Sequence, residues 1–227
     1  MGWFTSTINS SLGKKYLMAL TGLFLVIYLA IHLFGNSFIY AGEHAFNEYV
    51  AALTESKLKY VIRVIEIVLF LGFLVHIFEG IKLTIDNFSA RPNRYAVKPA
   101  NPQSELSSRT MWITAAVVFF FLVVHMKQFW YAYHSASPEM NFSMYKVVVD
   151  TFSDPAYSLL YLASVLFLGF HLFHGFQSAF QTLGLNHIKY RRLIINLGRI
   201  YAVIITIGFA SFPVVFLMKR FFLGGNL

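Results

Sequence analysis

The sequence predicts an all-α fold: an integral membrane bundle of five transmembrane helices in a single domain, residues 1–227. Three observations support this prediction. Apolar residues make up 57% of the chain and charged residues only 12%, whereas a soluble domain carries about 25% charged residues. The apolar residues gather in five runs, each long enough to cross the roughly 30 Å hydrocarbon core as a helix. Tyrosine and tryptophan stand at the ends of several runs, as in the aromatic belts of membrane proteins.

The five predicted spans are 16–40, 60–85, 111–133, 156–183 and 193–222. The first span follows Lys14 and Lys15, an arrangement also found in signal peptides. It is too long for the apolar core of a signal peptide and lacks a small-residue cleavage site, so we interpret it as a membrane helix. Segments 42–56 and 141–152 are semi-apolar and are predicted to lie on the membrane surface as short helices. Segment 87–108 contains three prolines and several cations, which predicts an irregular loop.

The distribution of lysine and arginine predicts the orientation. One set of connecting segments holds Lys14, Lys15, Lys82, Arg91, Arg94, Lys98, Arg109, Lys189, Arg191, Arg192 and Arg199, and the other holds Lys57, Lys59, Arg63, Lys127, Lys146, Lys219 and Arg220. The richer set is expected on the cytoplasmic side, which places the N-terminus inside and the C-terminus outside. Basic cytoplasmic loops also explain the net charge of +8, and nucleic acid is not an expected partner. The chain has no cysteine, which excludes disulfides, thiolate-bound iron–sulfur clusters and cysteine nucleophiles within it.

The eight histidines divide into two groups. His44, His134 and His187 fall in predicted loops and are interpreted as surface residues, whereas His32, His76, His125, His171 and His174 fall inside spans. An imidazole that faces lipid is costly, so histidines within a membrane usually face the bundle interior and mark function. For any one of them, a hydrogen-bonded core residue is as good an interpretation as a ligand.

The depths of four histidines narrow this choice. His32 and His125 each lie eight residues before the tyrosine that ends an outward-running span, so they share a level in the outer half. His76 and His171 lie near the inner ends of spans two and four, and each is followed four residues later by a glycine. One histidine from each of four helices, matched in two pairs, is what two bis-histidine haems require. A bare glycine beside each inner histidine suits a flat, bulky ligand.

Other residues follow from this interpretation. His174 is three residues from His171, which makes it either a neighbour that supports the ligand or the haem propionates, or an alternative ligand. Gly72, one turn before His76, is predicted to clear space for a ring, and Gly22, Gly35 and Gly169 are predicted either to do the same or to let helices approach closely. Haem propionates need cations near the membrane edge, and the candidates are Lys82, Arg91, Arg94, Lys127 and Arg199, although each also fits simple anchoring. Glu66 inside span two indicates a proton or quinone role, or an ion pair with Arg63 one turn earlier.

Several segments resemble a known family. The segment SSLGKKYLMALTGLFLVIYLAIHLFGN (10–36), the motifs HIFEG and HLFHG, and the segments SSRTMW and VHMKQFW are similar to the five-helix, single-chain, di-haem cytochrome b subunit of succinate dehydrogenase and fumarate reductase. The similarity covers nearly the whole chain and is greatest to the type found in bacteria that use menaquinone.

The resemblance implies two haems b, the inner or proximal one on His76 and His171 and the outer or distal one on His32 and His125. It implies a flavoprotein subunit and an iron–sulfur subunit as partners, a quinone (menaquinone) as substrate, and a place in the bacterial cytoplasmic membrane. Dicarboxylate chemistry would belong to the flavoprotein, with no residue of this chain catalysing it. An outer acidic residue serves the quinone site in some relatives, and Glu43, Glu48 and Glu55 compete for that role.

Two other functions fit part of the pattern. One is a di-haem cytochrome b that anchors a hydrogenase or a formate dehydrogenase, against which the first-helix segment argues. The other is a transporter or channel without haem, whose histidines relay protons. A transporter is expected to show broken helices or inverted repeats, whereas Pro213 is the only proline well inside a predicted span.

Overall fold

A computed structural model describes residues 2, 10–90, 102–136 and 142–223, with the backbone alone for 102–109 and 223. Within these ranges every regular element is helical. The long helices are α2 (Ser11–Ser37), α4 (Lys59–Ser89), α5 (Pro102–His125), α8 (Pro155–Thr182) and α9 (Arg191–Leu223). The shorter elements are η1 (Phe38–Ala41), α3 (Glu43–Thr54), η2 (Met126–Tyr131), α6 (Ala132–Ser135) and α7 (Met144–Ser153).

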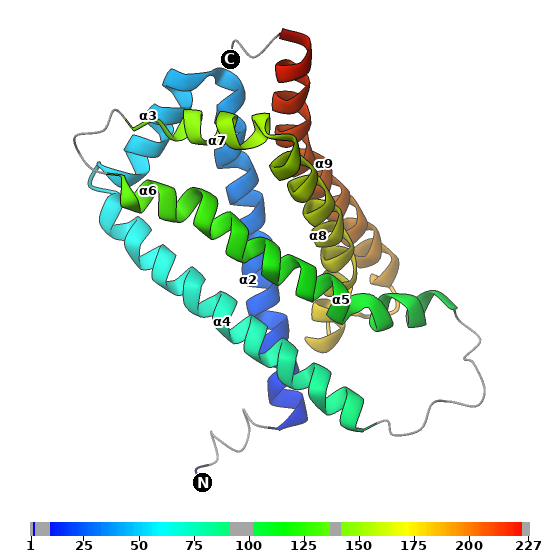
Figure 1. Cartoon of the computed structure of the whole chain (residues 1–227). Helices are drawn as coiled ribbons and strands as arrows, with labels where there is room; N and C mark the ends of the chain where they lie inside the picture. The colour runs from blue at the N-terminus through cyan, green and yellow to red at the C-terminus, as the bar shows by residue number, and fades with distance from the viewer. Residues whose placement is uncertain (1, 3–9, 91–101, 137–141, 224–227) are drawn as a thin grey trace.

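Five helical stretches in the described residues are long and apolar enough to cross a membrane. Figure 1 shows that α2, α5 and α9 run from the lower end of the bundle to the upper end, while α4 and α8 run down. The short helices α3 and α7 lie across the upper end. We use "lower end" for the end where α2 begins and "upper end" for the end where α2 finishes. The prediction of an all-helical fold with five helices long and apolar enough to span a membrane is confirmed for the described residues.

The helices extend beyond the predicted apolar runs at most ends. The first helix begins at Ser11, where the Ser10 side chain accepts a hydrogen bond from the Gly13 amide at 3.0 Å. Such a cap satisfies one of the free amides at a helix start, so the helix can begin in a polar stretch. The short helices expected within 42–56 and 141–152 are present as α3 and α7. Their place on the membrane surface stays a prediction.

The prediction that 87–108 is irregular is wrong at both ends. Helix α4 continues to Ser89, and α5 begins at Pro102. A span that already forms a helix extends cheaply into a polar flank, because propagation costs less than nucleation. Proline at the first position of a helix is also favourable, since its missing amide has no intrahelical partner there. Residues 91–101 lie outside the described ranges.

Two chain reversals have clear local causes. Asp154 accepts hydrogen bonds from the amides of Ala156 and Tyr157 at 2.7 and 3.4 Å, and Pro155 follows it, so α8 starts sharply after α7. Gly184 ends α8 with φ of +73°, and the Leu185 amide bonds back to the Phe180 carbonyl at 3.0 Å. Glycine adopts this left-handed conformation without a steric penalty.

The packing is dense on the α7, α8 and α9 side. A buried cluster at the upper end includes Phe152, Tyr161 and Phe216, and a second cluster joins α8 to α9. Helix α4 packs on α2 and α3 instead, and no apolar residue of α4 is buried in the part of the chain that is described. Its outward apolar face is therefore suited to lipid, and its inner face borders a hollow.

Candidate functional site

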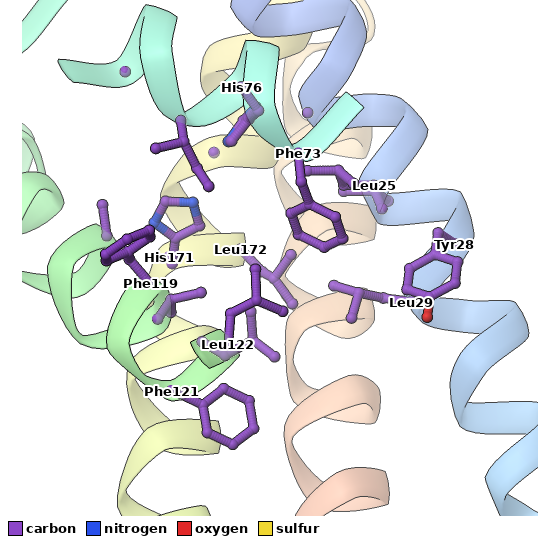
Figure 2. Close-up of a pocket in the computed structure, with 18 of the residues that line it drawn as sticks. Leu25, Tyr28, Leu29, Phe73, His76, Phe119, Phe121, Leu122, His171 and Leu172 are labelled. Carbon is purple, nitrogen blue, oxygen red and sulfur yellow. The ribbon is translucent and has the colours of Figure 1, made fainter. Parts of the chain in front are cut away.

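A single large cavity runs through the bundle. Its volume is about 3070 Å³, roughly three times the upper end of the 300–1,000 Å³ range of ordinary ligand pockets. Most of its lining comes from α2, α4, α5 and α8, with a few residues from α3, η2, α7 and α9, and the lining is mainly apolar, with leucine and phenylalanine the commonest residues. Figure 2 shows part of this lining, including His76, His171 and Phe73. A space of this size and polarity suits large, flat, apolar ligands.

The upper half of the cavity holds His32 of α2 and His125 of α5. Their ring centroids are 5.8 Å apart. The Tyr28 hydroxyl and the Asn36 amide lie 3.5 and 3.3 Å from Nδ1 of His32, and the Tyr161 hydroxyl lies 3.5 Å from Nδ1 of His125. Each imidazole therefore has a polar neighbour that orients its ring.

The lower half of the cavity holds His76 of α4 and His171 of α8, with ring centroids 6.3 Å apart. The Thr21 hydroxyl lies 3.2 Å from Nδ1 of His76. Nδ1 of His171 is buried and has no hydrogen-bond partner among the described residues. A buried polar atom without a partner costs about 1–3 kcal/mol, which favours a ligand that would give Nδ1 of His171 a partner.

These two spacings fit a metal held between imidazoles. An iron with one imidazole on each face needs ring centroids about 6 Å apart, since each bond is ~2 Å and each nitrogen is ~1 Å from its ring centre. Among the described residues, no three His, Cys, Asp or Glu side chains lie together in a way that could hold a metal ion. A two-histidine site must take its other ligands from elsewhere, as haem does from its pyrrole nitrogens. The donor set thus fits haem better than a bare ion.

The distance between the two histidine pairs along the bundle is nearly the same whether it is measured on α2 or on α8. On α2, Thr21 contacts the lower pair and His32 belongs to the upper pair; eleven residues separate them, or about 16 Å of helix. On α8, Tyr161 contacts the upper pair and His171 belongs to the lower pair; ten residues separate them, or about 15 Å. Both levels fit within a hydrocarbon core of ~30 Å.

The glycines divide between the cavity and helix packing. Gly22, Gly80 and Gly175 line the cavity, and Gly22 faces the His76 ring. A side chain at Gly72 would meet Phe24, one at Gly35 would meet Tyr49, and one at Gly169 would meet Thr206. The expectation that Gly72 clears ring space is therefore wrong, while Gly35 and Gly169 serve close packing, the second of their two predicted roles.

His174 also lines the cavity, below the lower pair. The ring paired with His76 is that of His171 rather than that of His174. Of the two roles predicted for His174, the structure favours a neighbour of the ligand position over a replacement for it.

The four acidic candidates differ in place. Glu66 lines the cavity, and its Oε2 lies 2.8 Å from Nη1 of Arg63. Glu43 accepts a hydrogen bond from Ser143 at 2.8 Å and so joins α3 to α7. Glu48 pairs with His44 at 3.4 Å on the exposed face, and Glu55 is exposed after the end of α3. Glu66 is the candidate that can reach a ligand in the cavity.

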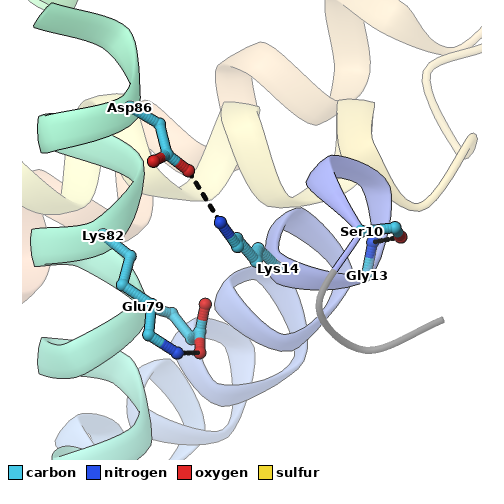
Figure 3. Close-up of polar contacts among 6 residues, drawn as sticks. All are labelled: Ser10, Gly13, Lys14, Glu79, Lys82 and Asp86. Atoms are coloured by element: carbon cyan, nitrogen blue, oxygen red, sulfur yellow. Dashed lines mark hydrogen bonds and ion pairs between the residues drawn. The ribbon is translucent and has the colours of Figure 1, made fainter. Parts of the chain in front are cut away.

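The cation candidates are also separated by the structure. Lys127 lines the cavity and lies two residues after His125. Lys15, which was not among the predicted propionate partners, lines the cavity at the lower end. Lys82 donates to Glu79 at 2.9 Å, next to the Lys14–Asp86 ion pair at 2.7 Å (Figure 3). Arg199 lies 5.5 Å from the Phe173 ring centre and does not line the cavity. Arg91 and Arg94 lie outside the described residues.

Sequence reasoning missed the polar residues that touch the histidines. Thr21, Tyr28, Asn36 and Tyr161 hold rings, and His134, interpreted as a surface residue, bonds to Arg63 at 2.8 Å. The spacing of Tyr28 and Asn36, four residues on either side of His32, was the available signal, because such residues share one helix face. Residues Met126–Tyr131, directly after His125, form a π-helical turn, a feature frequent at functional sites.

No family model, no curated protein and no solved structure matches this chain. The family expected from the sequence motifs therefore remains a prediction. The two histidine pairs inside one cavity are the features on which a function can be proposed.

Proposed function

We propose that this chain is the membrane-anchor and electron-conducting subunit of a succinate:quinone oxidoreductase and carries two haems b. The single observation that supports this most strongly is that two pairs of imidazoles line one apolar cavity, with ring centroids 5.8 Å apart in one pair and 6.3 Å apart in the other. His32 and His125 would hold the outer, distal haem, and His76 and His171 the inner, proximal haem. Each haem iron, when bound, supplies a one-electron couple between its ferric and ferrous states.

The chain's own residues do the rest. The imidazole pairs fix each ring at its depth, and the leucine and phenylalanine lining excludes water, which sets the dielectric around the iron. Thr21, Tyr28, Asn36 and Tyr161 hold the orientation of the histidine rings. Lys15 at the lower end and Lys127 at the upper end line the cavity and would meet the negative propionates.

The remaining parts of the proposal follow the resemblance. The lower end would be cytoplasmic and would bind the iron–sulfur and flavoprotein subunits, where the dicarboxylate chemistry takes place. The quinone, menaquinone by the resemblance, would exchange electrons with the chain in a bacterial cytoplasmic membrane. Among the acidic candidates, Glu66 is the one placed to exchange a proton with such a ligand, because it lines the cavity.

Haem content tests the proposal directly. We expect two haems b per chain in the purified protein by a pyridine haemochrome assay. Variants His32→Ala and His125→Ala should each lose one spectral species, and His76→Ala and His171→Ala the other. His187→Ala is the matched control, because His187 is exposed between α8 and α9 and outside the cavity lining. A purified wild-type chain without haem would overturn the proposal, and one haem per chain would remove one pair.

Partner identity separates this enzyme from other respiratory complexes. Purification of the chain from its native membrane should bring down a subunit with covalent or tightly bound flavin, together with an iron–sulfur subunit. A hydrogenase or molybdenum-containing partner would instead assign the same di-haem chain to another enzyme.

A further inference from the structure

A chain of polar contacts joins α4 to η2 and α6, the elements that directly follow α5, at the edge of the cavity. Arg63 Nη1 lies 2.8 Å from Oε2 of Glu66 and 2.8 Å from Nε2 of His134. Nδ1 of His134 lies 2.8 Å from the Trp130 carbonyl, and the His134 ring stacks on Trp130 at 4.2 Å. Arg63, Glu66 and Trp130 all line the cavity. The contacts therefore connect two helices whose inner faces border the same hollow.

The chemistry of the partners fixes the protonation of His134. Arginine only donates, so Nε2 must accept, and a backbone carbonyl only accepts, so Nδ1 must carry the proton. His134 is thus neutral in this arrangement, and its Nε2 lone pair holds the Arg63 guanidinium. A second proton on the ring would remove that lone pair and break the contact with Arg63.

The cavity reaches the surface at this place. Its lining includes Phe70 of α4 and Tyr131 of η2, and each of these two residues is 61% exposed. Arg63 is more than half exposed at its side chain and Glu66 about one third. An amphiphilic ligand could therefore place its polar head beside these two residues and its apolar part along the lining. Both described contacts of Arg63 use Nη1, and arginine has further N–H donors on Nε and Nη2.

We propose that Arg63 and Glu66 form the head-group site of the quinone and that His134 is a positioning residue for Arg63. This inference rests on the proposed function, which supplies the quinone as ligand. The guanidinium donates to a quinone carbonyl oxygen, and the Glu66 carboxylate accepts from a quinol hydroxyl. His134 and Glu66 hold the guanidinium from two sides, so that its remaining N–H groups face the ligand. The charged and titratable groups described around His134 are Arg63 and Glu66 of α4 and Tyr133 on its own segment.

Binding of a short-chain naphthoquinone to the full chain in detergent tests this site without any haem readout. Quenching of tryptophan fluorescence gives the Kd, since Trp130 adjoins the site. Arg63→Gln and His134→Phe should each weaken binding about tenfold, as expected when a hydrogen bond to a charged group is lost. His134→Gln should bind within about threefold of wild type, because its amide oxygen still accepts from arginine. Glu55→Gln, an exposed acid outside the cavity, is the matched control.

Rescue by the conservative variant separates positioning from simple packing. His134→Phe keeps an aromatic ring beside Trp130 but has no acceptor for Arg63, whereas His134→Gln keeps the acceptor without the ring. Equal affinity of His134→Phe and wild type, or equal loss of affinity in His134→Phe and His134→Gln, would overturn the inference. Two haems with an unchanged naphthoquinone Kd in every variant would overturn this inference alone. Absence of haem would overturn the proposed function and leave the binding result standing.

Discussion

Thr21 favours the tautomer of His76 that carries its proton on Nδ1. Its hydroxyl donates to the Leu17 carbonyl at 2.7 Å, so at 3.2 Å from His76 it accepts from Nδ1–H. The lone pair of His76 is then on Nε2, the nitrogen left for a metal. In metal sites, a residue that accepts a hydrogen bond from the non-ligating nitrogen of a histidine holds that ligand in place, and its loss typically lowers metal affinity 10–100-fold. One hydroxyl of α2 thus prepares a histidine of α4 for ligation.

Thr21→Val should therefore weaken haem retention at the lower pair by about 10–100-fold, with the upper pair unaffected. Thr84→Val is the matched control, because Thr84 also lines the cavity and its hydroxyl bonds only to the Gly80 carbonyl among the described contacts. Transfer of haem to an apo-globin trap measures both rates. Identical rates for Thr21→Val and Thr84→Val would show that Thr21 has no orienting role.

At the scale of helices, small residues decide how closely α8 and α9 approach. Gly169 of α8 faces the Thr206 hydroxyl, and Gly198 of α9 faces the Phe176 ring. Association of helices in lipid depends on such close packing, since lipid chains are as apolar as leucine. The closely packed pair of α8 and α9 contributes one wall of the cavity. Helix α4, which packs on α2 and α3, contributes the opposite wall.

Gly169→Ala should destabilise the protein by about 1–3 kcal/mol, the usual cost of overpacking. The added methyl would overlap the Thr206 hydroxyl, so a second change, Thr206→Ala, should recover most of the loss. Thermal unfolding in detergent measures the effect. The control is Thr206→Ala alone, which removes the hydroxyl without adding a methyl at Gly169. A Gly169→Ala protein as stable as wild type would contradict the packing role of Gly169.

At the scale of the whole molecule, the described part of the chain has five helices that could span a membrane, and an odd number of spans would place the start of α2 and the end of α9 on opposite sides. Figure 1 shows α2 beginning at the lower end and α9 finishing at the upper end. Lysine and arginine are enriched in the segments of the lower end, including Lys14, Lys15, Lys189, Arg191 and Arg192. The positive-inside tendency then favours the lower end as cytoplasmic.

Reporter fusions check this orientation. A fluorescent protein fused to the N-terminus should fold and fluoresce in the cytoplasm, and alkaline phosphatase fused after residue 227 should be active outside. The reverse pattern would place the His32–His125 level in the inner leaflet and reverse the proposed direction of the electron path. Fusions after Thr54, in α3, give an internal control for the outer side.

The five helices were predictable because lipid leaves the backbone no alternative: every amide in an apolar run must bond within its own helix. The levels of the four histidines followed from counting residues along straight helices. The polar flanks were harder, and segment 87–108 was assigned wrongly, because the sequence pattern there does not show how far a helix propagates. The partners of the histidines were missed because contacts such as Thr21 with His76 join residues far apart in the chain.

The sequence by itself determined that this chain is built of apolar helices and that histidines lie at two depths, since length, hydropathy and rise per residue are local properties. Only the tertiary structure decided which glycines face the cavity, that Glu66 rather than Glu43 or Glu55 borders it, and that His134 reaches Arg63. These facts depend on the rotation of each helix about its axis and on which helices are neighbours. Packing between distant segments sets both, and no local pattern in the chain records them.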